Sequence, residues 1–425
     1  RVFKMKKLQL STLLLLFFAV IIASCGRQEG GQLIGVTDRP SWKGVNPYGM
    51  VYVPSGTLQI GVGDEDLSKS LVARPKTISV QGFFMDDTEI TNNEYRQFVN
   101  WVRDSLAHRK LEHVVEESEN DQQPPQNIID WEQEIDWEGD AEGDGVLEDM
   151  YYQGNERFAG RKELDVTKLV FEFQWYDWQR AAHDRTSNRT SHIHREKIKV
   201  YPDTLSWVRD YAYSYNEPMT RNYFWHPAFD DYPVVGVNWK MAKAFCYWRT
   251  KLWNMYGETA EISEDFRLPT EHEWEYAARG GREGAPYPWG AYYTRNAKGC
   301  LLANFKPGRG NYPEDGGLYT VKADGYYPND YGLFCMAGNV AEWTETAYFE
   351  NAYSFMHDLN PDIRVDAKES DDKTAKRKVI RGGSWKDVAF FMNTGTRTFE
   401  YQDTTKCYVG FRCVLTFLGR SINDF

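Results

Sequence analysis

The stretch Arg267–Gly280 (RLPTEHEWEYAARG) gives the clearest local structural signal in this 425-residue sequence. Thr270 and Glu273 have the spacing of a capping box, in which each side chain accepts a hydrogen bond from the backbone N–H of the other residue. The pattern therefore predicts a helix over Glu271–Arg279 that opens after Pro269, with Thr270 as its N-cap.

Four other stretches follow this helix in order. They are Tyr287–Gly290 (YPWG), Tyr331–Leu333 with Gly338–Thr344 (YGL and GNVAEWT), Arg381–Trp385 (RGGSW) and Gly410–Cys413 (GFRC). Together with the first stretch they resemble the sulfatase-modifying-factor family, also called the formylglycine-generating-enzyme family. The resemblance covers roughly residues 46–110 and 200–418 of a domain that we place at 46–420. It implies an α+β, loop-rich formylglycine-generating-enzyme-like fold, related to C-type lectins, with an inserted segment at 111–200.

Periodicity and turn residues predict the other main elements. Phe83–Asn100 begins as a strand and passes into a helix at Thr91, with Asn92 as an alternative cap, and Lys240–Leu252 is an amphipathic helix. The apolar faces are expected to hold Tyr95, Phe98, Val99 and Val102 in the first helix, and Ala244, Phe245 and Trp248 in the second. The remaining expectations are two strands around a turn in Tyr48–Ile60, an aromatic strand or helix in Leu169–Ala182, and short strands ending in Tyr408–Phe417.

Charge is unevenly distributed, and the inserted segment 111–200 carries most of the imbalance. The net charge is −12, and Glu112–Asp149 holds 15 acidic residues with no Lys or Arg, whereas Arg185–Lys199 is basic. We expect the acidic half to be mobile when alone, because it has little apolar content. Trp131 and Trp137 are expected to be anchors for a partner surface, and the basic run to receive the acidic stretch of this chain or of a neighbour. The alternative is a surface loop without a partner. No basic patch with interleaved aromatic residues predicts nucleic-acid binding.

The start of the sequence is typical of a bacterial lipoprotein. Lysines precede an apolar run, Leu13–Ala23, that is shorter than a membrane span, and Ile22–Cys25 has the form of a lipobox. We expect a signal peptide at 1–24, a lipidated Cys25 and a tether at 25–45. The alternative is an ordinary cleaved signal with a chance cysteine. Gly26 provides no aspartate-type retention signal, which favours the periplasmic face of the outer membrane.

Two segments carry a closer resemblance. Tyr201–Asp210 (YPDTLSWVRD) and Tyr223–Val237 (YFWHPAFDDYPVVGV), with the lipobox, are similar to the gliding-motility lipoproteins of Bacteroidetes, of the GldK (PorK) type rather than the related GldJ type. The resemblance implies a non-catalytic lipoprotein scaffold of the type IX secretion machinery. It also implies a homo-oligomeric periplasmic ring with a GldN (PorN)-type partner.

The family's oxidases use two cysteines that bind copper(I), placed shortly after a Gly-Gly-Ser-aromatic motif. Thiolates suit this chemistry because they are soft ligands and strong nucleophiles. The matching positions here are Asp387 and Met392, so we expect neither copper nor catalysis by the family mechanism. The alternatives are an oxidase with altered chemistry, and a lectin-like surface lipoprotein that binds carbohydrate or peptide.

The resemblance also implies a disulfide between Cys246 and Cys413. Cys300, Cys335 and Cys407 are left without an assigned role.

Calcium is the cofactor that the resemblance implies. One set of ligands matches Asn304, Asp315 and the carbonyl of Phe305. A second set matches Gly338, Val340 and Glu342, but Cys335 replaces an amide or carboxylate ligand there. Calcium prefers hard oxygen donors, so this replacement weakens the second set. The alternative is that Asn304 and Glu342 only hold loops by hydrogen bonds.

Overall fold

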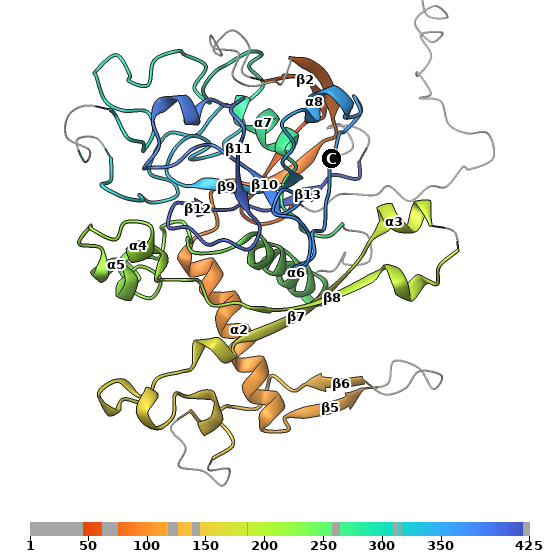
Figure 1. The fold of residues 1–425 in the computed structure, drawn as a ribbon, viewed down its shortest axis with the longest axis vertical. Coiled ribbons are helices and arrows are strands. Elements are labelled where there is room, and N and C mark those ends of the chain that lie inside the picture. The colour runs from red at the N-terminus through yellow and green to blue at the C-terminus, as the bar shows by residue number, and fades with distance from the viewer. Residues whose placement is uncertain are drawn as a thin grey trace, which may run out of the picture. The chain divides into compact units, whose positions relative to one another are not determined.

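Seven strands from distant parts of the chain form two sheets (Figure 1). The computed structural model describes residues 46–61, 75–117, 126–137, 145–184, 186–256, 264–308, 313 and 316–419. An antiparallel sheet has the order β1 (Met50–Val53), β4 (Phe83–Asp86), β13 (Val414–Thr416). A mixed sheet has the order β11 (Thr398–Tyr401), β10 (Arg377–Arg381), β9 (Ala341–Ala347), β12 (Val409–Gly410). The described residues lie in one compact unit, Val45–Ile422.

The two strands expected in Tyr48–Ile60 are present. They do not pair with each other: β1 pairs with β4, while β2 (Gly56–Ile60) pairs with β3 (Lys76–Val80). The strands expected at the end of the domain are also confirmed, as β12 and β13.

Helix α2 (Asn92–Lys110) follows β4 directly. Thr91 is its N-cap and forms a capping box with Glu94, so the prediction of Thr91 is confirmed. Asn92 is the first residue of the helix rather than the cap, and its amide donates to the carbonyls of Tyr223 and Phe229. The four residues expected on the apolar face, Tyr95, Phe98, Val99 and Val102, are all buried.

Helix α6 (Trp239–Tyr256) packs beside α2 (Figure 1). Tyr95 stacks on Phe245 with ring centroids 5.6 Å apart, and Phe98 lies 5.3 Å from Trp248. Buried aromatic pairs of this kind contribute about 0.5–1.5 kcal/mol each beyond their buried area. The two amphipathic helices read from the sequence therefore form one side of the main core.

Helix α7 (Glu271–Arg279) has the predicted bounds and the predicted capping box. Gly280 ends it in the left-handed region at φ 60°, a conformation that favours glycine. All nine residues of the helix are buried, so its charged side chains need partners inside the fold. Glu275 binds Arg279 at 2.7 Å, and Arg381 reaches both Glu271 and Glu275 at 3.2 Å.

The segment 111–200 contains two hairpins. The first is β5 (Val114–Glu117) with β6 (Gln126–Ile129); the second is β7 (Val170–Tyr176) with β8 (Ile193–Lys199), and carries α3 (Trp178–His183) between its strands. The aromatic stretch Leu169–Ala182, expected as a strand or a helix, is thus a strand followed by a short helix. Phe171 is buried 5.3 Å from Phe98, so this hairpin shares the main core.

Trp131 and Trp137 have partners within the chain: Trp131 stacks on Trp101 of α2 at 5.6 Å, and Arg103 lies over Trp137 at 4.8 Å. Trp131 is still 37% exposed, so the role of these rings as anchors for a partner surface stays a prediction. Within the described residues the basic run does not hold the acidic stretch of the same chain, and its pairing with a neighbouring chain stays a prediction. Glu148 binds Arg157 and Lys162, and Asp149 binds Lys110 and Lys168. Sequence reasoning missed these pairs because their partners come from α2 and from turns between the two hairpins.

The remaining elements are short. They are α4 (Ser206–Arg209), α5 (Glu217–Asn222), α8 (Ala352–Phe355) and 3₁₀ turns at Glu148–Met150, Gly154–Glu156, Phe158–Gly160, Val166–Lys168, Arg189–His192, Pro227–Phe229 and Ala389–Met392. Within the described ranges, no helix combines the length and apolarity that a membrane span requires.

Candidate functional site

The loop after β10 holds the two positions that match the family's copper cysteines. Gly382 and Gly383 begin it in the left-handed region, at φ 90° and 68°. A Cβ on Gly383 would lie only 2.8 Å from the carbonyl oxygen of Phe391, so glycine is required for the loop to fold back on itself. This turn places the backbone of Phe391 and Met392 directly against Gly383.

Asp387 is held by its own loop. Ser384 Oγ donates to its Oδ2 at 2.6 Å, and Lys386 Nζ lies 2.7 Å from its Oδ1. The Asp387 carbonyl also accepts from the backbone N–H of Lys306 at 2.9 Å. These bonds balance the charge of Asp387 and fasten the loop.

Met392 is fully buried. It belongs to a small apolar cluster with Tyr287, Leu301, Ala303, Phe305 and Ala337. Its thioether packs as a core residue, whereas Asp387 faces an ammonium group and a hydroxyl. Across the described residues, no group of three or more His, Cys, Asp or Glu side chains is placed to hold a metal ion.

The loops that match the first calcium set lie together. Asn304 O accepts from Asn339 N at 2.8 Å, and a Cβ on Gly338 would lie 2.3 Å from Asn304 O. Asn304 is buried, and its Nδ2 donates to Tyr319 O at 2.7 Å. Its Oδ1 accepts no hydrogen bond from another described residue. Asn304 Oδ1 and the Phe305 carbonyl are oxygen donors that fit calcium. Asp315 lies outside the described residues.

The second calcium set does not fit the ion. Both oxygens of Glu342 accept from Arg412, at 2.7 and 2.8 Å, and Trp274 Nε1 donates to the same carboxylate at 2.7 Å. A guanidinium therefore already neutralises the carboxylate of the set. Burial, and then the nearby Glu89, raise the pKa of Cys335 well above its usual value, so this thiol stays neutral and is a poor ligand. Glu342 therefore forms hydrogen bonds that join separate parts of the fold.

Sequence reasoning missed Glu89. Its side chain is fully buried and accepts from Asn339 Nδ2 at 2.8 Å and from Val340 N at 3.3 Å. Burial, and then the charge of Glu342, raise the pKa of Glu89 well above its usual value. The sequence shows Glu89 only as an acidic residue shortly after β4, and such residues are normally exposed, so nothing in the sequence indicated that it would be buried.

The two cysteines of the expected disulfide lie side by side. Cys246 is on α6 and Cys413 immediately precedes β13; both are buried, and their sulfur atoms are 3.4 Å apart. Both are free thiols in the structure, so the bond between them stays a prediction. Cys335 and Cys407 are buried at other places, and Cys300 is exposed.

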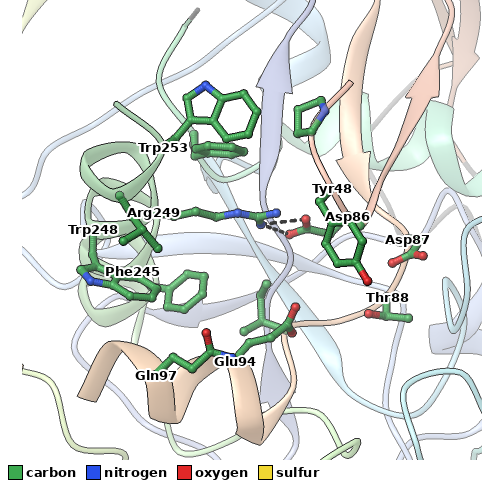
Figure 2. A pocket seen from close by; sticks show the side chains of 15 residues that line it. Tyr48, Asp86, Asp87, Thr88, Glu94, Gln97, Phe245, Trp248, Arg249 and Trp253 are labelled. Atoms are coloured by element: carbon green, nitrogen blue, oxygen red, sulfur yellow. Dashed lines mark hydrogen bonds and ion pairs between the residues drawn. The ribbon is translucent and has the colours of Figure 1, made fainter. Parts of the chain in front are cut away.

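A pocket of about 450 Å³ lies between the start of α2, the end of β4 and α6 (Figure 2). Phe245, Trp248 and Trp253 line one side of it and Tyr48 stands across from them (Figure 2). Phe266 packs edge-on against Trp253 and completes this aromatic wall. Arg249 crosses the pocket and binds Asp86 through Nη1, at 2.7 and 2.9 Å from the two carboxylate oxygens. The sequence did not predict this pocket, because its walls come from four separate segments of the chain.

Comparison with known proteins identifies the family of this chain. Residues 39–142 and 147–417 match the Sulfatase-modifying factor enzyme 1-like domain family. The chain belongs to this family. The matched ranges include both hairpins, and the placing of 111–200 as an insert within the domain stays a prediction.

Relatives of this sulfatase-modifying-factor chain include both enzymes and an inactive protein. Inactive C-alpha-formylglycine-generating enzyme 2 of Bos taurus is 34% identical over 189 residues, which cover 43% of this chain and 50% of that protein. Formylglycine-generating enzyme of Bos taurus is 25% identical over 378 residues, covering 88% and 76%. The enzyme of Thermomonospora curvata is 29% identical over 279 residues, covering 63% and 80%. The chain thus spans half the length of the inactive bovine relative, and the family contains members without the activity.

Among solved structures, PvdO from Pseudomonas aeruginosa is similar with a TM-score of 0.47 and 15% identity, over 87% of this chain and 94% of that one.

Proposed function

We propose that this chain is a non-catalytic lipoprotein scaffold of the type IX secretion and gliding-motility machinery. In this proposal it assembles with a GldN (PorN)-type partner in a homo-oligomeric ring at the periplasmic face of the outer membrane. The observation that carries the non-catalytic part is the Asp387–Met392 loop. Membership of a family that includes an inactive relative supports it.

The chemistry of the loop argues against the family oxidation. That reaction needs two thiolates to hold copper(I) and to form a bond with the substrate thiol. Asp387 is a hard carboxylate bound to Lys386, and Met392 has no ionisable proton and is fully buried. Neither side chain supplies the soft, accessible pair of ligands.

The membrane part of the proposal rests on the sequence. Cys25 lies outside the described residues, and its lipobox supports attachment of acyl chains. Two or more chains hold a protein stably at a membrane, whereas one gives marginal binding. Calcium at Asn304 and the Phe305 carbonyl belongs to the same proposal, as an ion that would stiffen a loop near the family motif and take no part in a reaction.

One pair of experiments tests the function. Copper(I) titration and oxygen uptake with a cysteine-containing peptide should give no stoichiometric binding and no turnover for the natural chain. The doubly substituted chain Asp387→Cys with Met392→Cys is the matched control, because it restores both thiols at the same positions. Copper-dependent turnover by the natural chain would overturn the non-catalytic assignment.

Assembly is tested separately. Native mass spectrometry and electron microscopy of the chain isolated from its membrane should show a multimer that contains a second protein species. A monomer that binds a glycan and no protein would favour the lectin-like alternative instead.

A further inference from the structure

We propose that the pocket between α2, β4 and α6 binds a lysine or arginine side chain presented by a partner polypeptide. The proposal goes beyond the scaffold function, because the pocket shares no lining residue with the Asp387–Met392 loop. It would hold for any partner that presents such a side chain.

The apolar part of the pocket is suited to the stem of a long side chain. The side chains of Phe245, Trp248 and Phe266 are almost fully buried, and each of them lines the pocket. Tyr48 is 97% exposed and stands opposite them (Figure 2), so the pocket is open on that side. The volume of about 450 Å³ lies within the usual range for ligand pockets and exceeds what one side chain needs.

The charges of the pocket favour a cation. Its lining holds three carboxylates, Asp86, Asp87 and Glu94, against one guanidinium, Arg249. Asp86 is satisfied by Arg249 and by the backbone N–H of Cys413 at 2.8 Å, so the Asp86–Arg249 pair is neutral and leaves two carboxylates over.

Among the described residues, neither of these two carboxylates forms an ion pair with Arg249, the one basic side chain of the pocket lining. Glu94 Oε2 caps Thr91, while Glu94 Oε1 accepts from no other described residue. Burial, and then Asp86, raise the pKa of Asp87, while Arg412, which is outside the pocket lining, lowers it. A positive group in the pocket would be attracted by both Asp87 and Glu94.

Other ligand classes fit less well. An anion would meet three carboxylates, and a neutral apolar group would leave two of them desolvated without a partner, which is unfavourable. The aromatic wall adds a cation–π attraction. The chain already uses the wall in this way, since the guanidinium of Arg249 lies 4.6 Å from the centre of the Phe266 ring. A lysine or arginine side chain from outside would take the same kind of contact on Trp248, Trp253 or Tyr48.

The test uses the full chain and a fluorescein-labelled blocked peptide, glycine-glycine-lysine-glycine-glycine, in a fluorescence-polarisation titration. The same peptide with norleucine in place of lysine keeps the stem and removes the ammonium. We expect the lysine peptide to bind at least about tenfold more tightly, because hydrogen bonds to charged groups are stronger than those between neutral groups. Binding should weaken as salt is added.

Variants locate the site. Glu94→Gln keeps a side chain that can complete the capping box, and Asp87→Asn keeps the shape of the side chain. Each variant should bind the lysine peptide several-fold more weakly. The matched control is Glu283→Gln, an exposed acid outside the pocket, which should change nothing. Thermal melting verifies that all three variants stay folded.

Three results would overturn the proposal. If the norleucine peptide binds as tightly as the lysine peptide, the positive charge is not what is recognised. If the three variants bind the lysine peptide equally well, the peptide does not bind in this pocket. n-Butylamine competing as effectively as the peptide would show a site for small free amines rather than for a polypeptide side chain.

Discussion

Glu342 and Arg412 face each other in the interior and share two parallel hydrogen bonds, Nη2 to Oε1 at 2.7 Å and Nε to Oε2 at 2.8 Å. Neither residue is exposed to solvent. Arg412 also donates to the carbonyls of Asp86 and Phe334, at 3.1 and 2.9 Å. The pair therefore joins β9, the end of β4 and the segment before β13 at one point.

Replacing Glu342 by Gln should destabilise the domain strongly. The change leaves the Arg412 guanidinium buried without its counter-charge, and breaking a buried pair in this way costs about 3–5 kcal/mol. Urea unfolding followed by circular dichroism measures the loss. Asp330→Asn is the control, because Asp330 and Arg282 form an exposed pair whose loss should change stability little. Equal losses in the two variants would contradict the role given to Glu342.

Glu89→Gln should make stability less sensitive to pH. Burial, followed by the charge of Glu342, raises the pKa of Glu89 well above 4.5. An acid whose pKa is raised on folding stabilises the folded state at pH values below its unfolded pKa, and this contribution is lost as the pH rises towards the folded pKa. As the pH is raised from 4.5 to 7.5, the variant should therefore become more stable relative to the natural chain. Unfolding free energies at both values check this; a constant difference between the chains would mean that Glu89 does not titrate there.

His108 should act in the opposite direction. Burial, and then His113, lower its pKa below 6.5, while Asp104 and Asp130 raise it. Its Nδ1 lies 3.1 Å from that of His113, and Trp131 packs against its ring. Because the folded pKa is lowered, the stabilisation is present above about pH 6.5 and falls away as the solution becomes more acidic. The melting temperature of His108→Gln should differ less between pH 7.5 and pH 5.5 than that of the natural chain. An unchanged difference in melting temperature would rule His108 out as the cause of the pH dependence.

The Cys246–Cys413 pair is expected to be oxidised in the mature protein. The two positions are 167 residues apart, and in the chain-entropy model a crosslink closing so long a loop stabilises by roughly 5 kcal/mol. Unreduced protein, unfolded in the presence of iodoacetamide, should give one peptide mass that joins the two cysteines. Carbamidomethyl groups on both cysteines under these conditions would show that the bond is absent. Cys300 is exposed and provides an internal control for labelling.

The lipid anchor is tested at Cys25. Cys25→Ala should abolish palmitate incorporation and move the protein out of the membrane fraction, because the acyl chains are its attachment. Cys300→Ala serves as the matched cysteine substitution. A Cys25→Ala chain that still incorporates palmitate would disprove the assignment.

Local sequence patterns predicted the helices well and the contacts between distant segments poorly. The capping boxes at Thr91 and Thr270 depend on residues three positions apart, and both are present. The partners of Trp131 and Glu89 lie elsewhere in the chain, on α2 and on the loop before β9, where no spacing rule reaches.

The family motifs gave a second kind of information, since they marked loops without showing what those loops do here. Asn304 and Gly338 meet as the family pattern implies, because glycine is needed where its backbone touches the Asn304 carbonyl. The same pattern matched Glu342 to a calcium ligand, and the partner that changes its role, Arg412, stands 70 residues further along the chain.

The antiparallel pairing of β4 with β13 has a consequence for how the chain reaches its final form. The contact between Asp86 and Arg412 spans 326 residues, so no growing chain can complete this sheet until almost the entire domain has left the ribosome. Until then the edge of β4 and the apolar side chains beneath it remain open to other molecules, and the loop to be closed makes the final step slow. The topology therefore makes the completion of this sheet one of the last steps of folding.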